Sequence, residues 1–270
     1  MAESLYQDLF RRLEGVRWQL ADLPLDQVDP KLVDPWLVEM VRLNCLVEIS
    51  SLYAVRMFLR DFQHNPDFCQ FMSIWYYEEM KHHLAQWEYL KVLGKEPDPG
   101  SYGQLETDLK PAPWPATLAM HWIGELRVGM WYHRWAERSR EPVLRQLMQW
   151  IGNDEFRHAQ CYEEFMEKGL EEDPKSLLQY LNAVKYMLVN PGLDKHPTTF
   201  SEGSVDGLSV ADRIGFDHYR AVLQREITAE DEQRLSRRAL KVLSRLSGED
   251  LQSLGDLMRL GRKLENQEAA

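Results

Sequence analysis

Apolar residues recur at intervals of three and four along most of the chain, the spacing that gathers side chains on one face of an α-helix. No segment shows the period of two that is typical of a half-buried strand, so the sequence predicts an all-α fold. Asn65-Pro66 and Glu141-Pro142 each mark a helix start, because proline suits the first turn of a helix. Together these patterns predict four long helices, at about 35–62, 66–94, 114–140 and 142–172.

The connections between the predicted helices suggest how the chain is organised. Five prolines and two glycines in residues 95–115 indicate a long crossover loop between the second and third helices. Ferritin-like four-helix bundles have such a crossover. We therefore expect one domain over residues 1–270, with a bundle core at about 35–173 and a helical extension at about 174–270.

Shorter elements are expected on both sides of the bundle core. An amphipathic segment at 4–22 precedes a linker rich in Pro and Asp at 23–35. After Pro174 one more helix is expected to end near residue 190, and a polar loop follows to residue 207. Three further helices are expected to open at Ser209, Thr228 and Ser247, the last two with a Ser/Thr-x-x-Asp capping signal.

Glutamates interrupt the apolar faces of all four long helices. Glu48 and Glu125 stand alone on the first and third, whereas the second and fourth carry the pairs Glu79-x-x-His82 and Glu155-x-x-His158. Residues three apart lie on one face of a helix, so each pair directs a carboxylate and an imidazole to the same interior point. Burying an unpaired carboxylate costs several kcal/mol, so four of them indicate a common partner. The alternatives are buried Glu–Arg or Glu–His pairs, or helices rotated so that the glutamates reach solvent.

A pair of metal ions is the simplest common partner for these side chains. The six candidate ligands match the carboxylate-bridged two-metal site of a four-helix bundle. Carboxylate oxygens with two imidazole nitrogens suit iron or manganese better than zinc or calcium. We expect two iron ions, with an iron–manganese pair as the alternative.

Composition limits the other classes of function. The chain has 32 Lys and Arg against 43 Asp and Glu, a net charge of −11, which argues against general nucleic-acid binding. The three cysteines show no Cys-x-x-Cys spacing, so they predict neither a disulfide framework nor a zinc knuckle, and they fit a reducing cytoplasm. No run of eighteen apolar residues and no apolar signal region occurs, so we expect a soluble protein without a membrane span.

Several residues beside the candidate ligands have two interpretations each. Asp154 either accepts a hydrogen bond from a histidine ligand, which fixes the orientation of that ring, or is a surface aspartate. His121, one turn before Glu125, is either a further ligand or a core histidine. Candidate positions along a substrate channel are Gly124, Val128, Gly129, Trp122, Tyr76 and Tyr162. The glycines and Val128 equally suit a close helix–helix contact, and the two tyrosines equally suit a proton- or radical-carrying role or plain packing.

Basic residues form a stripe on the penultimate predicted helix. The stripe consists of Arg234, Arg237, Arg238, Lys241 and Arg245, opposite apolar residues of the same helix. It is either a solvated face or a docking surface for an acidic carrier protein or a phosphopantetheine group.

The ligand pattern, together with other segments, resembles the soluble acyl-carrier-protein desaturases of the ferritin-like superfamily over residues 35 to about 230. Glu78-Glu-Met-Lys-His82 resembles an acidic–Glu–x–Arg–His segment of that family, and Glu171-Glu-Asp-Pro174 resembles its acidic Asp-Pro exit. Phe216-Asp-His-Tyr-Arg-Ala-Val-Leu-Gln224 resembles its Phe-Asp-His-Phe-x-x-Val-x-Gln stretch. The resemblance implies terminal ligands at Glu48 and Glu125, bridging ligands at Glu79 and Glu155, and nitrogen ligands at His82 and His158.

The resemblance also implies an activity. Members of the family use dioxygen and two electrons from a ferredoxin-type donor to remove two hydrogens from a carrier-bound acyl chain, and a homodimer is the expected assembly. The chain departs from the family at Val128, where desaturases carry a threonine that assists the oxygen chemistry. A di-iron hydroxylase or N-oxygenase is the alternative within enzymes, although N-oxygenases carry a histidine at the position of Ile151. A ferritin-like metal-handling protein is the alternative outside enzymes.

Overall fold

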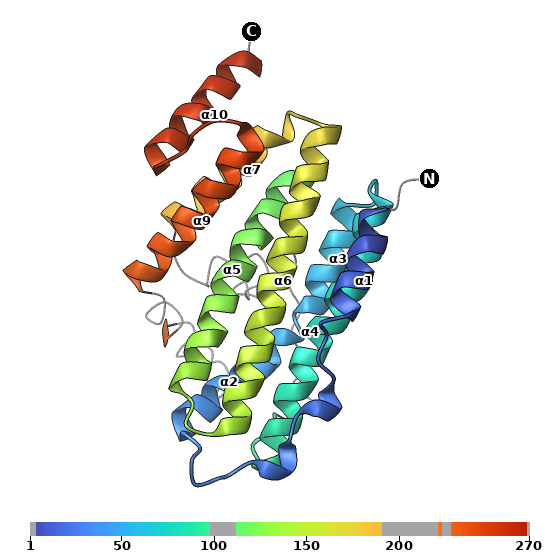
Figure 1. The fold of residues 1–270 in the computed structure, drawn as a ribbon, viewed down its shortest axis with the longest axis vertical. Coiled ribbons are helices and arrows are strands. Elements are labelled where there is room, and N and C mark those ends of the chain that lie inside the picture. Colours follow the sequence, from blue (N-terminus) through green and yellow to red (C-terminus); the bar gives the residue numbers. More distant parts are fainter. Residues whose placement is uncertain (1–3, 98–111, 191–220, 223–227, 269–270) are drawn as a thin grey trace. The chain divides into compact units, whose positions relative to one another are not determined.

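The computed structural model describes residues 4–97, 112–190, 221–222 and 228–268, and within these ranges it contains helices and no strand (Figure 1). The prediction of an all-α fold is therefore confirmed for this part of the chain. The elements are α1 (Leu5–Glu14), η1 (Leu20–Asp22), η2 (Leu25–Gln27), α2 (Pro35–Glu48), α3 (Ser51–Asp61), α4 (Pro66–Val92), α5 (Trp114–Arg138), α6 (Pro142–Glu172), α7 (Ser176–Val189), α9 (Ala229–Ser247) and α10 (Leu254–Glu268). Among the described helices, none is long and apolar enough to cross a membrane.

The chain divides into two compact units, which we describe separately. The first unit comprises residues 1–111, 129–154 and 198–222, and the second comprises 112–128, 155–197 and 223–270. The division falls inside the helices α5 and α6. The bundle core at about 35–173 and the extension at about 174–270 remain predictions. The single domain over 1–270 remains a prediction.

Several predicted helix starts are confirmed by their caps. The side chain of Asn65 accepts a hydrogen bond from Phe68 N at 3.0 Å, and Pro66 occupies the first turn of α4. A carboxylate oxygen of Glu141 accepts from Leu144 N at 2.7 Å at the start of α6. These side chains satisfy backbone N–H groups that the first turn of a helix leaves without an acceptor.

The first long helix differs from its prediction. Instead of one helix over 35–62, the chain forms α2 and α3, separated by a turn at Ile49–Ser50. The hydroxyl of Ser51 donates to the backbone carbonyl of Glu48. In a continuous helix, this carbonyl would accept a hydrogen bond from a backbone N–H group instead. Serine side chains compete with the backbone in this way and weaken helix interiors.

The C-terminal caps are partly as predicted. Thr228 forms a capping box with Asp231 at the start of α9, as expected. The helix predicted to open at Ser247 instead begins at Leu254, because α9 continues to Ser247 and ends at Gly248, whose φ of 71° is the left-handed C-cap conformation. Ser253 Oγ then accepts from Asp256 N at 3.2 Å, so the capping signal is six residues further on. The crossover loop at 98–111, the helix at Ser209 and most of the segment at 216–224 lie outside the described residues.

In the first unit, α1, α2 and α3 each lie against α4 (Figure 1). Aromatic side chains fill the end of this unit where α3 passes into α4. The rings of Phe62 and Phe68 stack with centroids 3.9 Å apart, and Phe58 meets Trp75 edge-on at 5.5 Å. Burial of large aromatic rings contributes strongly to the free energy of folding, so these contacts stabilise the packing of α3 against α4.

In the second unit, α7 lies against α9 and α10. Arg127 of α5 is fully buried and donates to both carboxylate oxygens of Glu232 in α9, at 3.0 and 3.1 Å. It also donates to the backbone carbonyl of Met187 in α7 at 2.5 Å. One guanidinium therefore joins three helices, and its charge is neutralised by a bidentate carboxylate.

Candidate metal centre

The first unit contains a buried triad of the predicted ligand types. Glu48 comes from the last turn of α2, whereas Glu79 and His82 come from the middle of α4, one turn apart. Each offers one ligand atom within 4.8 Å of the others. The two carboxylates are 7% exposed and the imidazole is 0% exposed. The helix break after Glu48 leaves this residue at a helix end.

The second unit contains a corresponding triad. Glu125 lies on α5, and Glu155 and His158 lie one turn apart on α6. Their ligand atoms are also within 4.8 Å of one another, and all three residues are buried. His158 Nδ1 lies 3.0 Å from Glu155 Oε2, so the pair directs nitrogen and oxygen to one point, as the Glu-x-x-His spacing predicts.

These two triads have the donor chemistry of a metal site. Each provides two carboxylates and one imidazole at buried positions. Buried carboxylates repel one another and lose their hydration, and a cation offsets both effects. Oxygen donors with one nitrogen per triad suit iron or manganese. The buried acidic and histidine groups could therefore hold metal ions, and the individual ligand roles remain predictions.

Asp154 is fully buried and contacts a histidine of the first triad. Its Oδ2 lies 3.0 Å from His82 Nε2 and 3.3 Å from Lys81 Nζ, and accepts from Trp18 Nε1 at 2.7 Å. Because Asp154 engages Nε2, the tautomer with its proton on Nε2 is favoured, and Nδ1 is the nitrogen with a lone pair for a metal ion. Asp154 is therefore not a surface aspartate, and its orienting role remains a prediction.

The partners of Asp154 could not be predicted from the sequence. Trp18 lies in the connection after α1 and stacks on Trp150 at 5.2 Å, and Lys81 lies 4.0 Å from the centroid of the Trp18 ring. A neighbouring ion pair joins Arg17 to the buried Glu78 at 2.9 Å. These contacts span 61 to 136 residues of sequence, so no local pattern could have revealed them.

Cys45 is buried one turn before Glu48 on α2. Burial, with the neighbouring charge of Glu48, raises the pKa of the Cys45 thiol far above its ordinary value. Cys45 lies against His83, whose Nδ1 is 2.8 Å from the backbone carbonyl of Cys45. Burial lowers the pKa of His83, which favours its neutral form.

Contacts with neighbouring side chains are described for three of the remaining candidates. Trp122 is fully buried and donates through Nε1 to Glu163 at 3.0 Å. His121 and Tyr162 are buried, with their rings edge-on at 6.5 Å. Tyr76 and Val128 are half-buried, and Gly124 is buried. The roles in a substrate channel remain predictions for five of these positions: Trp122, Tyr162, Tyr76, Val128 and Gly124.

Gly129 lies at a close approach of two helices within the first unit. A Cβ atom on Gly152 would lie 3.1 Å from the carbonyl oxygen of Gly129 and 2.9 Å from a carbon of the His133 ring. Such distances are shorter than ordinary van der Waals contacts. The close contact depends on Gly152 having no Cβ atom, and both interpretations of Gly129 remain predictions.

The basic stripe of α9 is exposed, and part of it is engaged in ion pairs. Arg238 pairs with Glu163 at 3.2 Å, and Arg245 pairs with Glu163 and Glu167, so these side chains link α9 to α6. Arg234 pairs with Glu230 on its own helix at 3.0 Å. Arg237 and Lys241 are exposed, and within the described residues no ion pair includes them. Any docking surface on this stripe would therefore centre on Arg237 and Lys241.

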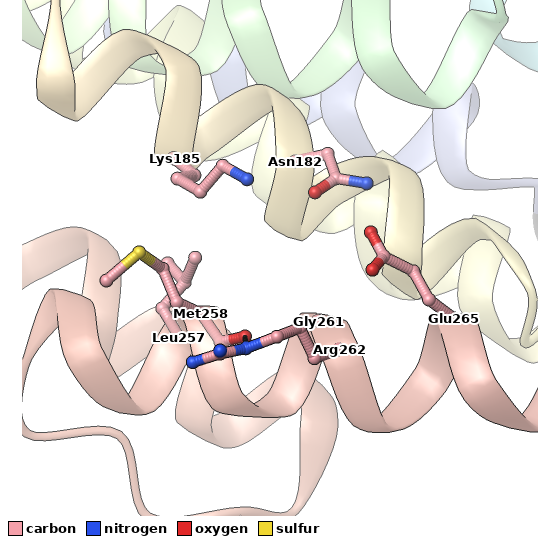
Figure 2. A pocket seen from close by; sticks show the side chains of 7 residues that line it. All are labelled: Asn182, Lys185, Leu257, Met258, Gly261, Arg262 and Glu265. Atoms are coloured by element: carbon pink, nitrogen blue, oxygen red, sulfur yellow. Dashed lines mark hydrogen bonds between the residues drawn. The ribbon is translucent and has the colours of Figure 1, made fainter.

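A groove of about 410 Å³ lies between α7 and α10 of the second unit (Figure 2). Its lining is one acidic, two basic and four uncharged residues: Asn182, Lys185, Leu257, Met258, Gly261, Arg262 and Glu265. It contains no histidine or cysteine and a single carboxylate. The groove therefore lacks the ligand set that both triads provide.

Part of the chain matches a protein-family model. Residues 131–260 match a family model described as fatty acid desaturase. The match supports a desaturase-type family. The matched segment contains Asp154 and the Glu155–His158 pair. It begins after Glu125, so it covers only part of the ligand pattern. It indicates a desaturase-type oxidoreductase. No curated protein matches the chain.

Proposed function

We propose that this protein is a di-iron, dioxygen-dependent desaturase of an acyl thioester. The observation that carries the proposal is the pair of buried Glu/Glu/His triads, one in each unit, in a chain that is similar to fatty acid desaturases over residues 131–260. Each triad has the ligands for one ion, and the sequence pattern assigns bridging roles to Glu79 and Glu155 by resemblance. An iron–manganese pair is the alternative metal content.

Two bound iron ions would supply the dioxygen-activating chemistry that removes two hydrogens from an acyl chain. The protein contributes burial, orientation and charge. Low exposure of both triads keeps water away from the ligands, which strengthens their electrostatic interaction with a cation. Asp154 fixes the tautomer and ring plane of His82, and Glu155 and His158 direct their ligand atoms to one point.

The proposal includes partners. The acyl chain would be bound to acyl carrier protein or coenzyme A, and a ferredoxin-type protein would supply electrons. Arg237 and Lys241 offer exposed positive charge for an acidic carrier, because complementary charge increases the rate of protein association. We further propose a cytoplasmic homodimer that binds neither nucleic acid nor membranes.

Mass spectrometry of acyl thioesters tests the reaction. The protein is incubated with iron, a ferredoxin reducing system, labelled dioxygen and a panel of carrier- and coenzyme-A-bound acyl chains. A product that has lost two hydrogens and carries no label supports desaturation, and a His82→Ala, His158→Ala variant serves as the control for metal dependence. Absence of substrate-dependent oxygen consumption with every member of the panel would contradict an oxidoreductase and favour metal handling.

A hydroxylase or N-oxygenase is the second candidate, and Val128 favours it. This half-buried valine stands where the desaturases that the chain resembles carry a threonine. Label incorporated into the product of an acyl or amine substrate would transfer the assignment to oxygenation. Ile151, fully buried and apolar, provides no histidine at the position that N-oxygenases use, so hydroxylation is the better supported of the two.

A further inference from the structure

Three buried polar side chains converge on one oxygen of Glu48. Asn44 Nδ2 donates to Glu48 Oε1 at 3.0 Å, Gln86 Nε2 donates to the same oxygen at 3.4 Å, and the hydroxyl of Tyr132 donates to it as well. Asn44 comes from α2, Gln86 from α4 and Tyr132 from α5, all within the first unit. All three donors thus point at Oε1.

Asn44 also contacts the other two donors. Asn44 Nδ2 lies 3.0 Å from Gln86 Oε1 and 2.5 Å from the hydroxyl oxygen of Tyr132. Gln86 and Tyr132 are 0% exposed and Asn44 is 2% exposed. A buried network whose members are mutually bonded is rigid, because turning one side chain away would leave buried polar groups without partners.

We propose that Asn44, Gln86 and Tyr132 form a clamp that occupies Glu48 Oε1, so that Glu48 binds its metal ion through Oε2 alone. The inference rests on the proposed function, since it concerns how a ligand of that centre binds. A cation at Oε1 would have to displace three N–H or O–H donors whose positive ends face it. One-oxygen binding by Glu48 leaves a coordination position on that ion for an external ligand.

Tyr132 acts in this clamp as a positioning residue. Its hydroxyl contacts the ligand carboxylate and Asn44, and its ring is fully buried beside Trp131 at 5.2 Å. Each of the three clamp donors has a hydrogen bond to Glu48 Oε1. The clamp therefore acts on Glu48.

Crystal structures of the manganese(II)-loaded protein test the clamp. In the wild type, one Glu48 oxygen should lie at bonding distance from the ion; in Tyr132→Phe, release of Oε1 should bring both oxygens to bonding distance. In solution, the cobalt(II)-loaded Tyr132→Phe variant should show weaker visible absorption bands than wild type, as expected for a higher coordination number. Tyr180→Phe removes the hydroxyl of another fully buried tyrosine, on α7, and should leave both readouts unchanged.

The outcomes separate the clamp from the function. Wild-type protein that binds manganese(II) with both Glu48 oxygens overturns the clamp and leaves the metal centre intact. Wild-type protein that binds no manganese(II) or cobalt(II) overturns the clamp and the proposed function together. If Tyr132→Phe does not fold, Gln86→Met removes a second donor and should produce the same change in the cobalt spectrum; an unchanged spectrum contradicts the clamp.

Discussion

Replacing Asp154 by Asn should weaken metal binding and lower stability, although the two side chains have nearly the same shape. The Asp154 carboxylate interacts with His82 Nε2, Trp18 Nε1 and Lys81 Nζ, and it is 0% exposed. An amide in its place has no charge, and it can turn its NH2 group to His82. His82 would then carry its proton on Nδ1, the nitrogen assigned to the metal ion.

The size of both effects follows from these contacts. Loss of a partner that orients a histidine ligand reduces metal affinity by about 10–100-fold. Removing one partner of a buried ion pair costs about 3–5 kcal/mol. Lys81 keeps its position over the Trp18 ring at 4.0 Å and its hydrogen bond to Trp18 O at 3.3 Å, so we expect the lower end of that range. For a chain of this length, about 3 kcal/mol corresponds to a decrease in Tm of roughly 6–12 °C.

Two measurements check this prediction. Competition between the protein and a chelator gives the affinity for iron(II), and thermal unfolding of the metal-free protein gives the stability. Asp173→Asn, an exposed position between α6 and α7, is the matched control and should change neither quantity. Wild-type affinity together with wild-type Tm in Asp154→Asn would refute the orienting role of this carboxylate.

Further substitutions test the packing and the titration behaviour. Gly152→Ala should reduce the free energy of unfolding by about 1–3 kcal/mol, because its Cβ would lie 2.9 Å from the His133 ring. The matched change Gly261→Ala, where no atom lies within 4 Å, should raise it by about 0.5–1 kcal/mol; urea denaturation that ranks the two variants the other way contradicts the close contact. Burial, and then the charges of Asp173 and Glu172, raise the pKa of Tyr180, so the folded protein keeps a proton that the unfolded chain releases above about pH 10. Stability should therefore fall as pH rises from 10 to 12, and Tyr180→Phe should reduce this slope by up to about 1.4 kcal/mol per pH unit; an unchanged slope would show that Tyr180 titrates normally.

The helices were predictable wherever the signal was local. Apolar periodicity together with Asn65-Pro66 and Glu141-Pro142 placed α4 and α6 correctly, since caps and prolines act within one turn. The break between α2 and α3 was missed because no proline or glycine marks it, and the serines at positions 50 and 51 are also common within helices. The start of α10 was misplaced because Ser247 and Ser253 both precede an Asp at the third position, and only the left-handed Gly248 decides between them.

The candidate ligands were predictable for a related reason. Glutamates on apolar helix faces and the Glu-x-x-His spacing are properties of single helices, and they identified the members of both triads. The surroundings of the triads were not predictable. Tyr132 and Asn44 are 88 residues apart, and Trp18 and Asp154 are 136 apart. Their contacts depend on tertiary packing, which leaves no spacing in the sequence.

Iron content per chain tests the central claim most directly. After anaerobic loading with iron(II) and removal of loosely bound metal, the wild type should retain about two iron ions per chain, the number expected of this bundle type. His82→Ala and His158→Ala alter one triad each, so each should retain about one, and Glu79→Ala combined with Glu155→Ala should retain almost none. Wild-type iron content in that double variant, or no tightly bound iron in the wild type, would contradict a two-iron centre built from these triads.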